Sequence, residues 1–82
     1  MLSLKIHIKN FHGENALVIN DNLIINIKDI DYIELYAHTI LKITNTVCIY
    51  TLDNHNWIFI NENANCIRNF LKTADLKNIK IK

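Results

Sequence analysis

Hydrophobic and polar residues alternate without a break along residues 2–9. Leucine and isoleucine occupy the even positions, while serine, lysine and histidine occupy the odd ones. Because successive side chains of a β-strand point to opposite faces, this pattern predicts a strand with one buried and one solvated face. Residues 10–15 are then predicted to form a loop, in which Gly13 can adopt a positive φ angle at no steric cost.

Short apolar segments continue as far as residue 60, in a chain that has no proline and one glycine. Asparagine, aspartate and histidine must therefore make the turns, and the first two tolerate left-handed backbone. We expect hairpins over residues 16–28 and 39–52. After residues 2–9, the predicted strands cover residues 16–20, 23–28, 30–35, 39–44, 47–52 and 57–60.

Beyond residue 61 the apolar residues recur at helical spacing. A single apolar stripe predicts an α-helix over about residues 62–74 that buries one side. The stripe consists of Ala64, Ile67, Phe70, Leu71 and Ala74.

Polar residues near both ends of this helix agree with those bounds. Asn61 or Asn63 is expected to cap the N-terminus, and Glu62 suits the positive end of the helix dipole. Lys72 suits the negative end, and Arg68 and Lys72 are expected on the outer side.

The chain of 82 residues is expected to form a single β-rich domain over residues 1–82, of the α+β class. Short strands at this spacing predict a small, strongly bent antiparallel sheet or barrel of about seven strands. The C-terminal helix would cover its open end or one face. The alternating tail, residues 76–82, would either add an edge strand whose lysines discourage further pairing, or fray.

Composition adds constraints on partners and on the cellular compartment. Half of the residues are hydrophobic, which argues against disorder, and the formal charge of +1 supplies no field for nucleic acid or an anionic membrane. No apolar run is long enough for a membrane span, and no signal peptide is evident. Cys48 and Cys66 are then expected as reduced thiols of a cytoplasmic protein. The excess of isoleucine and asparagine, sixteen and thirteen residues, suggests an AT-rich genome.

The run LVINDNLIINIKDIDYIEL, residues 17–35, resembles the third-strand region of bacterial pleckstrin-homology-like domains. In that family a polar hairpin turn leads into an Ile-x-x-x-Asp-Ile segment, here Ile25 to Ile30, and then into Ile-Glu-Leu, here residues 33–35. The resemblance implies two near-orthogonal sheets of seven strands, a closing C-terminal helix and an adaptor-like role in protein assemblies. Lipid-headgroup binding is not implied, because residues 10–27 contain no lysine or arginine.

A second run, IKDIDYIELYAHTILKIT, is similar to LytTR-type DNA-binding domains. The similarity implies that His38 lies in a DNA-contacting loop. The charge balance favours the first family, because phosphate contacts need clustered lysine and arginine. The nearest basic set is expected to act as a solubilising face, and it comprises Arg68, Lys72, Lys77, Lys80 and Lys82.

No catalytic, metal or cofactor site is predicted. The four histidines are scattered in sequence, although folding could bring His38 and His55 together. Asp29 and Asp31 share strand parity with each other and lie near Glu34. We interpret this cluster as a solvated face or an acidic patch for a basic partner, rather than as a pair for general acid–base chemistry.

Strand parity would place Tyr32, Glu34 and Tyr36 together on one face, with Ile33 and Leu35 on the other. Tyrosine is enriched in contact sites because it combines apolar area with a hydroxyl group. These tyrosines either cover the sheet or form an interface. The predicted partner-binding residues are Tyr32, Glu34, Tyr36 and His38.

Residues 57–60 raise a similar question. Trp57 and Phe59 share one parity and Ile58 and Ile60 the other, so one pair must be less buried unless both faces are covered, by the helix or by a partner such as a second copy. We expect a non-enzymatic protein-binding module, for example an accessory or inhibitor protein of a phage or mobile element. The alternative is loop-mediated DNA binding of the LytTR type.

Overall fold

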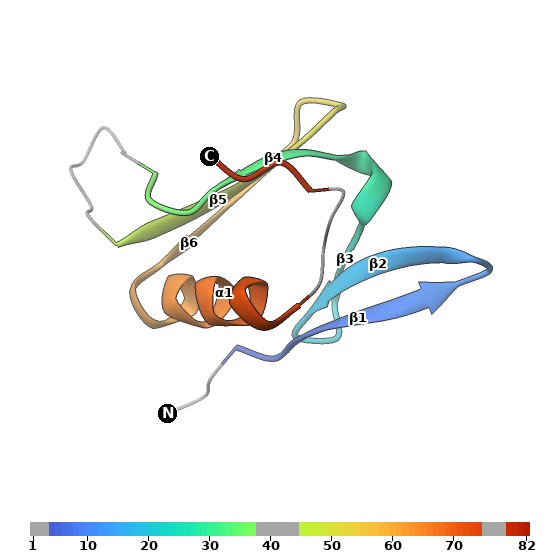
Figure 1. Ribbon diagram of the computed structural model, residues 1–82, viewed down its shortest axis with the longest axis horizontal. Coiled ribbons are helices and arrows are strands. Elements are labelled where there is room, and N and C mark those ends of the chain that lie inside the picture. The colour runs from blue at the N-terminus through green and yellow to red at the C-terminus, as the bar shows by residue number, and fades with distance from the viewer. Residues whose placement is uncertain (1–3, 38–44, 75–78) are drawn as a thin grey trace.

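The computed structural model describes residues 4–37, 45–74 and 79–82. Within these ranges the fold is α+β, with two antiparallel sheets of three strands each and an α-helix after the last strand (Figure 1). The strand order in each sheet follows the chain. The elements are β1 (Ile6–Phe11), β2 (Glu14–Ile19), β3 (Leu23–Asn26), the 3-10 turn η1 (Ile27–Asp29), β4 (Ile30–Glu34), β5 (Thr46–Thr51), β6 (Asn56–Ile60) and α1 (Asn61–Thr73).

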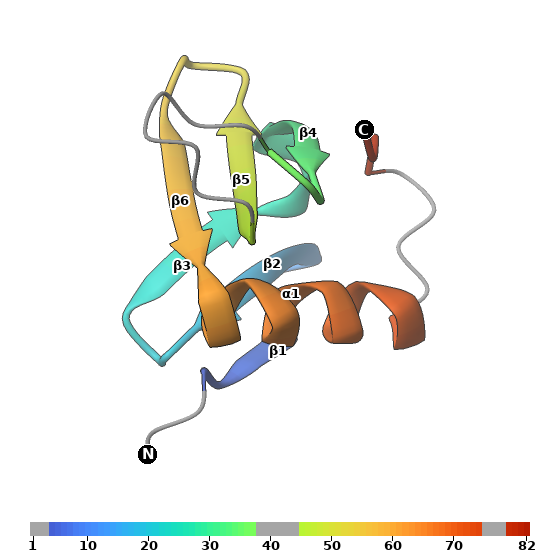
Figure 2. The same cartoon turned by 90° about the vertical axis from the view of Figure 1, so that its left-hand side faces the viewer.

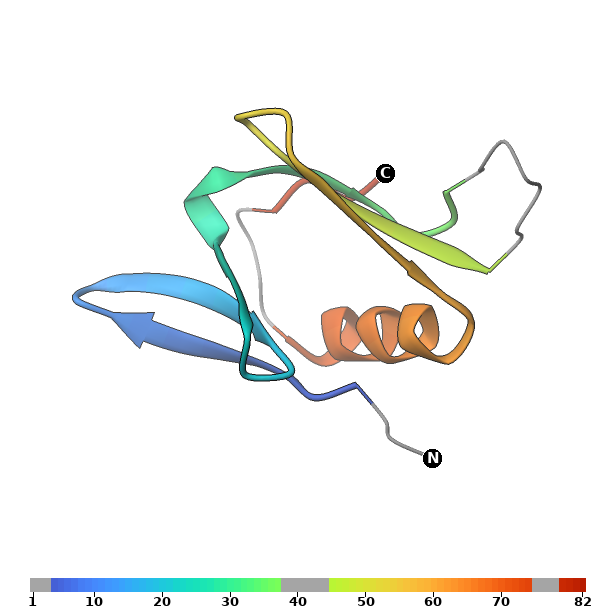
Figure 3. The same ribbon diagram turned by 180° about the vertical axis from the view of Figure 1, so that it is seen from behind.

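The predicted α+β class is confirmed, whereas the predicted single bent sheet or barrel of about seven strands is wrong for the described part of the chain. That part holds six strands, and they form two separate sheets. The first sheet consists of β1, β2 and β3, and the second of β4, β5 and β6. The sheets separate at η1, where the chain bends between β3 and β4 and the two strands do not pair (Figure 3). The predicted strand at 39–44 lies outside the described residues.

The predicted loop over residues 10–15 is instead a tight hairpin. Phe11 pairs with Glu14, so the connection is only His12 and Gly13, with φ angles of 52° and 88°. Two consecutive residues with positive φ give a hairpin turn whose twist matches that of the flanking strands. The strands therefore run up to the turn and include residues that looked too polar for a sheet.

Asparagine, aspartate and histidine make the strained turns, as expected from a chain with so little glycine. Every non-glycine residue with positive φ in the described ranges is of one of these types. Short polar side chains lower the cost of left-handed backbone, because they can bond to the nearby main chain. The residues are His12, Asn20, Asp21, Asn54 and Asn61.

In the second sheet, β5 is the central strand and pairs with β4 and β6 (Figure 2). The register between β4 and β5 shifts between Ile30 and Tyr32, which indicates a β-bulge. One extra residue in a strand changes which face the following residues occupy. Ile30 and Ile33 are three positions apart, yet both are buried in the core because of this shift.

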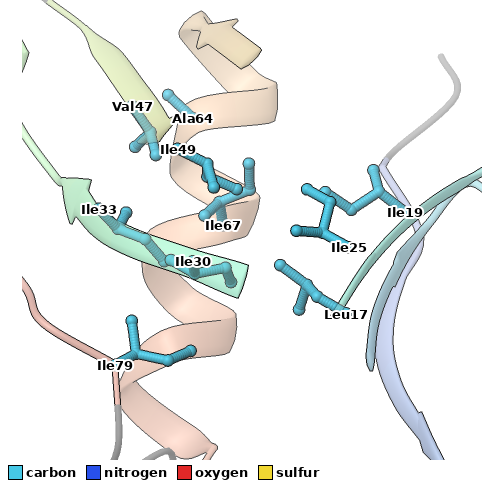
Figure 4. Close-up of a cluster of buried hydrophobic side chains, with 10 residues drawn as sticks. All are labelled: Leu17, Ile19, Ile25, Ile30, Ile33, Val47, Ile49, Ala64, Ile67 and Ile79. Atoms are coloured by element: carbon cyan, nitrogen blue, oxygen red, sulfur yellow. The ribbon is translucent and has the colours of Figure 1, made fainter. Parts of the chain in front are cut away.

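The hydrophobic core lies between the two sheets and α1 (Figure 4). Figures 1 and 3 show α1 on one side of the gap between the sheets, and it contacts β1, β5 and β6. The apolar stripe of the helix explains this position, since Ala64 and Ile67 are both fully buried. The core residues are Leu17, Ile19, Ile25, Ile30, Ile33, Val47, Ile49, Ala64, Ile67 and Ile79.

The start of α1 differs from the predicted asparagine cap. Ile60 occupies the N-cap position, and no side chain caps the helix. Asn61 has a φ angle of 54° and turns the chain sharply from β6 into the helix. Asn45 stabilises this corner, because its carbonyl accepts a hydrogen bond from the Asn61 N–H at 2.9 Å and its Nδ2 donates to the Asn61 carbonyl at 3.1 Å. Glu62 and Lys72 lie in the first and last turns, as predicted.

The C-terminal tail pairs with the free edge of β4. Ile81 forms a parallel bridge with Ile33, and the Lys82 N–H donates to the Ile33 carbonyl at 2.8 Å. The Ile33 N–H in turn donates to the Lys80 carbonyl at 2.9 Å. Of the tail predicted over residues 76–82, the described residues 79–82 thus lie along β4 through an isolated bridge, and residues 76–78 lie outside the described residues.

Candidate binding surface

The outer face of the second sheet, opposite the core, carries the first two predicted site residues. Tyr32 pairs with Tyr50 across β4 and β5, and Glu34 pairs with Cys48. Cys48 is also opposite Ile58 of β6. We call this set, Tyr32, Glu34, Cys48, Tyr50 and Ile58, the tyrosine face. The predicted placement of Tyr32 and Glu34 on a face opposite Ile33 is confirmed, since Ile33 pairs with Ile49 in the core.

Two stacked rings form the centre of the tyrosine face. The centroids of Tyr32 and Tyr50 are 4.4 Å apart and the ring planes differ by 24°. The Lys82 ammonium lies 4.1 Å from the Tyr32 centroid, which is a cation–π distance. The tail thus supplies a cation to the edge of this face.

Both tyrosines hold their protons more tightly than free tyrosine does. Burial, followed by the negative charges of Glu34 and Asp31, raises the pKa of the Tyr32 hydroxyl. A hydrogen bond with Cys48, together with burial and a hydrogen bond with Glu34, raises the pKa of the Tyr50 hydroxyl well above its usual range. Both hydroxyls are neutral at pH 7 and retain a proton to donate.

Residues 57–60 divide between the core and solvent. Trp57 and Phe59 pack against the core, whereas Ile58 and Ile60 are 57% and 41% exposed. The less buried pair is therefore the isoleucines. Ile58 extends the tyrosine face across β6, so that an aromatic pair and an exposed aliphatic residue lie on one side of the same sheet.

Tyr36 does not join Tyr32 and Glu34, because β4 ends at Glu34 and strand alternation ends with it. Its ring lies 4.4 Å from the guanidinium carbon of Arg68 in α1, and it is 67% exposed. The structure thus places the predicted site residues in two groups, with Tyr36 at the helix. His38 lies outside the described residues.

Arg68 was expected on the outer side of α1, and this prediction is wrong. The residue is 9% exposed. Its Nε donates to the Leu35 carbonyl at 2.7 Å, and its Nη1 donates to Asn65 Oδ1 at 3.0 Å. The guanidinium thereby holds the end of β4 against the helix. Position 68 is four residues after Ala64 and three before Leu71, so helical spacing could have placed it in the apolar stripe.

A cavity of about 140 Å³ adjoins Arg68. Its wall combines aliphatic side chains with two cationic ones and the Tyr36 ring. No pattern in the sequence indicated it, because its walls come from β4's end, α1 and the tail. We call it the Arg68 pocket, and its lining residues are Leu35, Tyr36, Arg68, Leu71, Lys72, Ala74 and Ile81.

Asp29 and Asp31 lie in different elements. Asp29 belongs to η1 and Asp31 to the bulged start of β4, so they do not share a strand face as predicted. Asp53 instead accepts a hydrogen bond from the Thr51 hydroxyl, and one of its oxygens lies 3.2 Å from His55 Nδ1. The Thr51 hydroxyl, and then His55, lower the pKa of the Asp53 carboxyl.

The described residues contain no group of three or more histidine, cysteine, aspartate or glutamate side chains that could hold a metal ion. Cys48 and Cys66 are both free thiols. Cys48 is 2% exposed, although it lies on the outer side of β5 beside Glu34 and not in the core cluster.

Comparison with protein families, curated proteins and solved structures yields no match for this chain. Among the described residues, no helix has the length and apolar character needed to cross a membrane.

Proposed function

We propose that this chain is a non-enzymatic protein-binding module that contacts another protein through the tyrosine face. The observation that carries the proposal is the 57% exposure of Ile58 on the same sheet face as the stacked Tyr32 and Tyr50. Exposed apolar side chains beside aromatic rings mark surfaces that association would remove from water.

The physical chemistry of this face favours a partner with its own apolar surface. Covering an aliphatic side chain such as Ile58 contributes on the order of 1.5–3 kcal/mol at full burial. The two tyrosines are already ordered by their mutual stacking, so they lose little conformational freedom on binding. Their neutral hydroxyls can donate or accept hydrogen bonds at the rim of such a contact.

The arrangement of elements supports a pleckstrin-homology-like interpretation of the fold. Two antiparallel sheets are followed along the chain by a C-terminal helix, which is the order of elements that the resemblance implies. The helix packs against strands of both sheets. We therefore include in the proposal an adaptor-like role, in which the chain acts as an accessory or inhibitor protein by covering part of a larger target. The same face could also bind a second copy of the chain.

A pair of matched variants tests the proposal. Ile58→Arg introduces a charge into the tyrosine face, while Ile24→Arg introduces the same charge at a residue of similar exposure, 54%, on the first sheet. Tagged wild-type and variant proteins would be used to capture partners from the native host, with the bound proteins identified by mass spectrometry. We expect Ile58→Arg to weaken capture at least about tenfold and Ile24→Arg to leave it unchanged.

Two further readouts make the result interpretable. Circular dichroism should show the same folded spectrum for both variants, since both residues are half exposed. Size-exclusion chromatography would report self-association, and a dimer dissociated by Ile58→Arg alone would identify the partner as a second copy. Equal capture by wild type and Ile58→Arg would refute the role of the tyrosine face.

DNA binding of the LytTR type stays a prediction with less support. Among the described cations, Arg68 is buried and Lys28 is paired with Glu14 at 2.6 Å, so neither is available to a phosphate. A fluorescence anisotropy titration with duplex DNA at low and high salt tests it. Binding that weakens steeply with salt would favour DNA, and no binding at low salt would exclude it.

A further inference from the structure

Within the described ranges, Arg68 is a buried cation that no carboxylate compensates. No carboxylate pairs with it among the described residues, and its two hydrogen bonds go to neutral acceptors, the Leu35 carbonyl and the Asn65 side chain. Its third nitrogen, Nη2, is buried and has no hydrogen-bond partner there. Arginine is rarely buried unless it is paired, because the charge loses its hydration.

A ligand's negative charge that compensates Arg68 would fit into the Arg68 pocket. Arg68 itself lines this cavity of about 140 Å³ together with Lys72, an exposed residue that makes no ion pair within the described ranges. The guanidinium fork can bind a carboxylate through two parallel hydrogen bonds, and the ammonium adds a second positive charge. The electrostatics of the pocket therefore select an anion.

The remaining lining residues are aliphatic, and they favour a ligand that carries an apolar group beside its anionic group. Leu35, Leu71, Ala74 and Ile81 contribute side chains from three parts of the chain. A ligand that fills this space must carry an apolar group within a few bonds of its negative charge. The last residue of a polypeptide does so when its side chain is aliphatic, because the carboxylate and the side chain share one Cα atom.

Tyr36 is the residue whose movement can open the Arg68 pocket. Its ring lies over the guanidinium at 4.4 Å and offers partial compensation for the buried charge. The ring is 67% exposed and follows the last residue of β4 by two positions, so little packing opposes its rotation. Moving it aside would expose more of the guanidinium, and the Arg68–Leu35 bond does not involve the Tyr36 side chain.

We propose that the Arg68 pocket binds the C-terminal carboxylate of a partner chain that ends in an aliphatic residue, with Tyr36 as a movable cover. This specifies the partner's chemistry and in that sense rests on the proposed protein-binding function. The pocket is nevertheless distinct from the tyrosine face, and the two can be tested separately.

The test is a ¹H–¹⁵N NMR titration of the full chain with N-acetyl-Gly-Gly-Leu, as the free acid and as the C-terminal amide. We expect the free acid to shift the Arg68 Nε–H signal and the backbone signals of Leu71 and Ile81 saturably, with a Kd on the order of 1 mM. The amide should bind about tenfold more weakly or worse, because it lacks the charge. Equal affinity for acid and amide, or no saturable shift with the acid, would overturn the proposal.

Two more probes separate the terminal carboxylate from other anions. N-acetyl-Gly-Gly-Gly, which lacks the aliphatic side chain, should bind several-fold more weakly than the leucine peptide. N-acetylglutamate α-amide carries its carboxylate on a side chain and should also bind more weakly. If it binds as tightly as the leucine peptide, the site recognises acidic side chains and the assignment to a chain terminus is wrong.

Variants assign the binding to the pocket. Arg68→Gln keeps donors for the Leu35 carbonyl while removing the charge, and should reduce affinity at least about tenfold. If Arg68→Gln fails to fold, Lys72→Gln serves the same purpose from an exposed position, with an expected loss of about threefold against no loss in Lys9→Gln. Ile58→Arg should leave peptide affinity unchanged, so that failure of this proposal is distinguishable from failure of the tyrosine face. Equal peptide binding by wild type, Arg68→Gln and Lys72→Gln would contradict the site.

Discussion

The two sheets have the same number of strands in the same sequential order, yet their outer faces differ. On the first sheet, His7 and Lys9 of β1 are exposed and flank the smaller residues of β2. On the outer face of the second sheet, β4 and β5 carry the stacked Tyr32 and Tyr50. The outer face of the first sheet therefore carries polar side chains along β1, whereas that of the second carries a stacked aromatic pair.

Ile24 and Ile58 show why exposure alone does not identify a binding surface. Their exposed fractions are 54% and 57%. Ile24 pairs with Val18, whose other neighbour is His7, so the apolar area stops at a polar strand. Ile58 pairs with Cys48, and the stacked tyrosines occupy the adjacent row of the same face, so Ile58 has aromatic residues as diagonal neighbours. The neighbours across the strands distinguish a scattered surface residue from part of a patch.

The largest expected effect comes from alanine substitutions in the shared core. They test whether the two sheets fold as one unit despite their different surfaces. Leu17 of the first sheet and Ile33 of the second are both fully buried in the shared core. Alanine at either position should lower the free energy of unfolding by roughly 2–5 kcal/mol, as expected for a large side chain removed from a core. Urea unfolding followed by circular dichroism measures both. Two separate unfolding transitions, each shifted by only one of the two variants, would mean that the sheets fold independently.

A smaller effect should distinguish the tyrosine face by its response to pH. The pKa values of Tyr32 and Tyr50 are raised in the folded chain, so the folded state binds these protons more tightly than the unfolded state does. Their contribution to stability is complete below about pH 10, the value of unfolded tyrosine, and is lost as the pH rises beyond it.

Urea unfolding at pH 8 and at pH 11 measures this loss. The free energy of unfolding of Tyr50→Phe should fall less between the two pH values than that of the wild type, since the variant has no hydroxyl at position 50 to ionise. Lysines also titrate in this range, so the difference between variant and wild type is the informative quantity. An identical decline in both proteins would show that Tyr50 does not carry the effect.

The smallest effect is expected at the charged edge of the first sheet. Lys28 and Glu14 form a salt bridge at 2.6 Å, with exposed fractions of 61% and 48%, and the bond to Glu14 raises the pKa of Lys28. Exposed ion pairs contribute little because water and salt screen them. Lys28→Ala should therefore shift the urea midpoint only slightly, and less at high salt. A shift as large as that of Leu17→Ala would contradict this account.

Local sequence patterns predicted much of the fold because they act over a few residues. The helical stripe located α1 to within one residue at each end, and the asparagine-rich turns appear with positive φ as expected. The errors occurred where local preference was insufficient. The His12-Gly13 turn was too short to recognise, and Ile60 rather than an asparagine caps α1.

The candidate site was predictable only in part. Parity correctly placed Tyr32 and Glu34 on one face, because both lie inside β4. It failed for Tyr36 because the strand ends first, at Glu34, and the next residue, Leu35, accepts a hydrogen bond from Arg68 of α1. Residues 35 and 68 are far apart in sequence, so no window of local pattern contains both.

By itself, the sequence determined the α+β class, the succession of short strands and a closing helix, and most of the buried side chains. These follow from periodicity and from the cost of exposing apolar residues to water. Only the tertiary structure decided that the strands form two separate sheets, that the tail joins β4, and that Arg68 is buried beside a cavity. Those features arise from contacts between distant segments, whose energies depend on how the elements pack together.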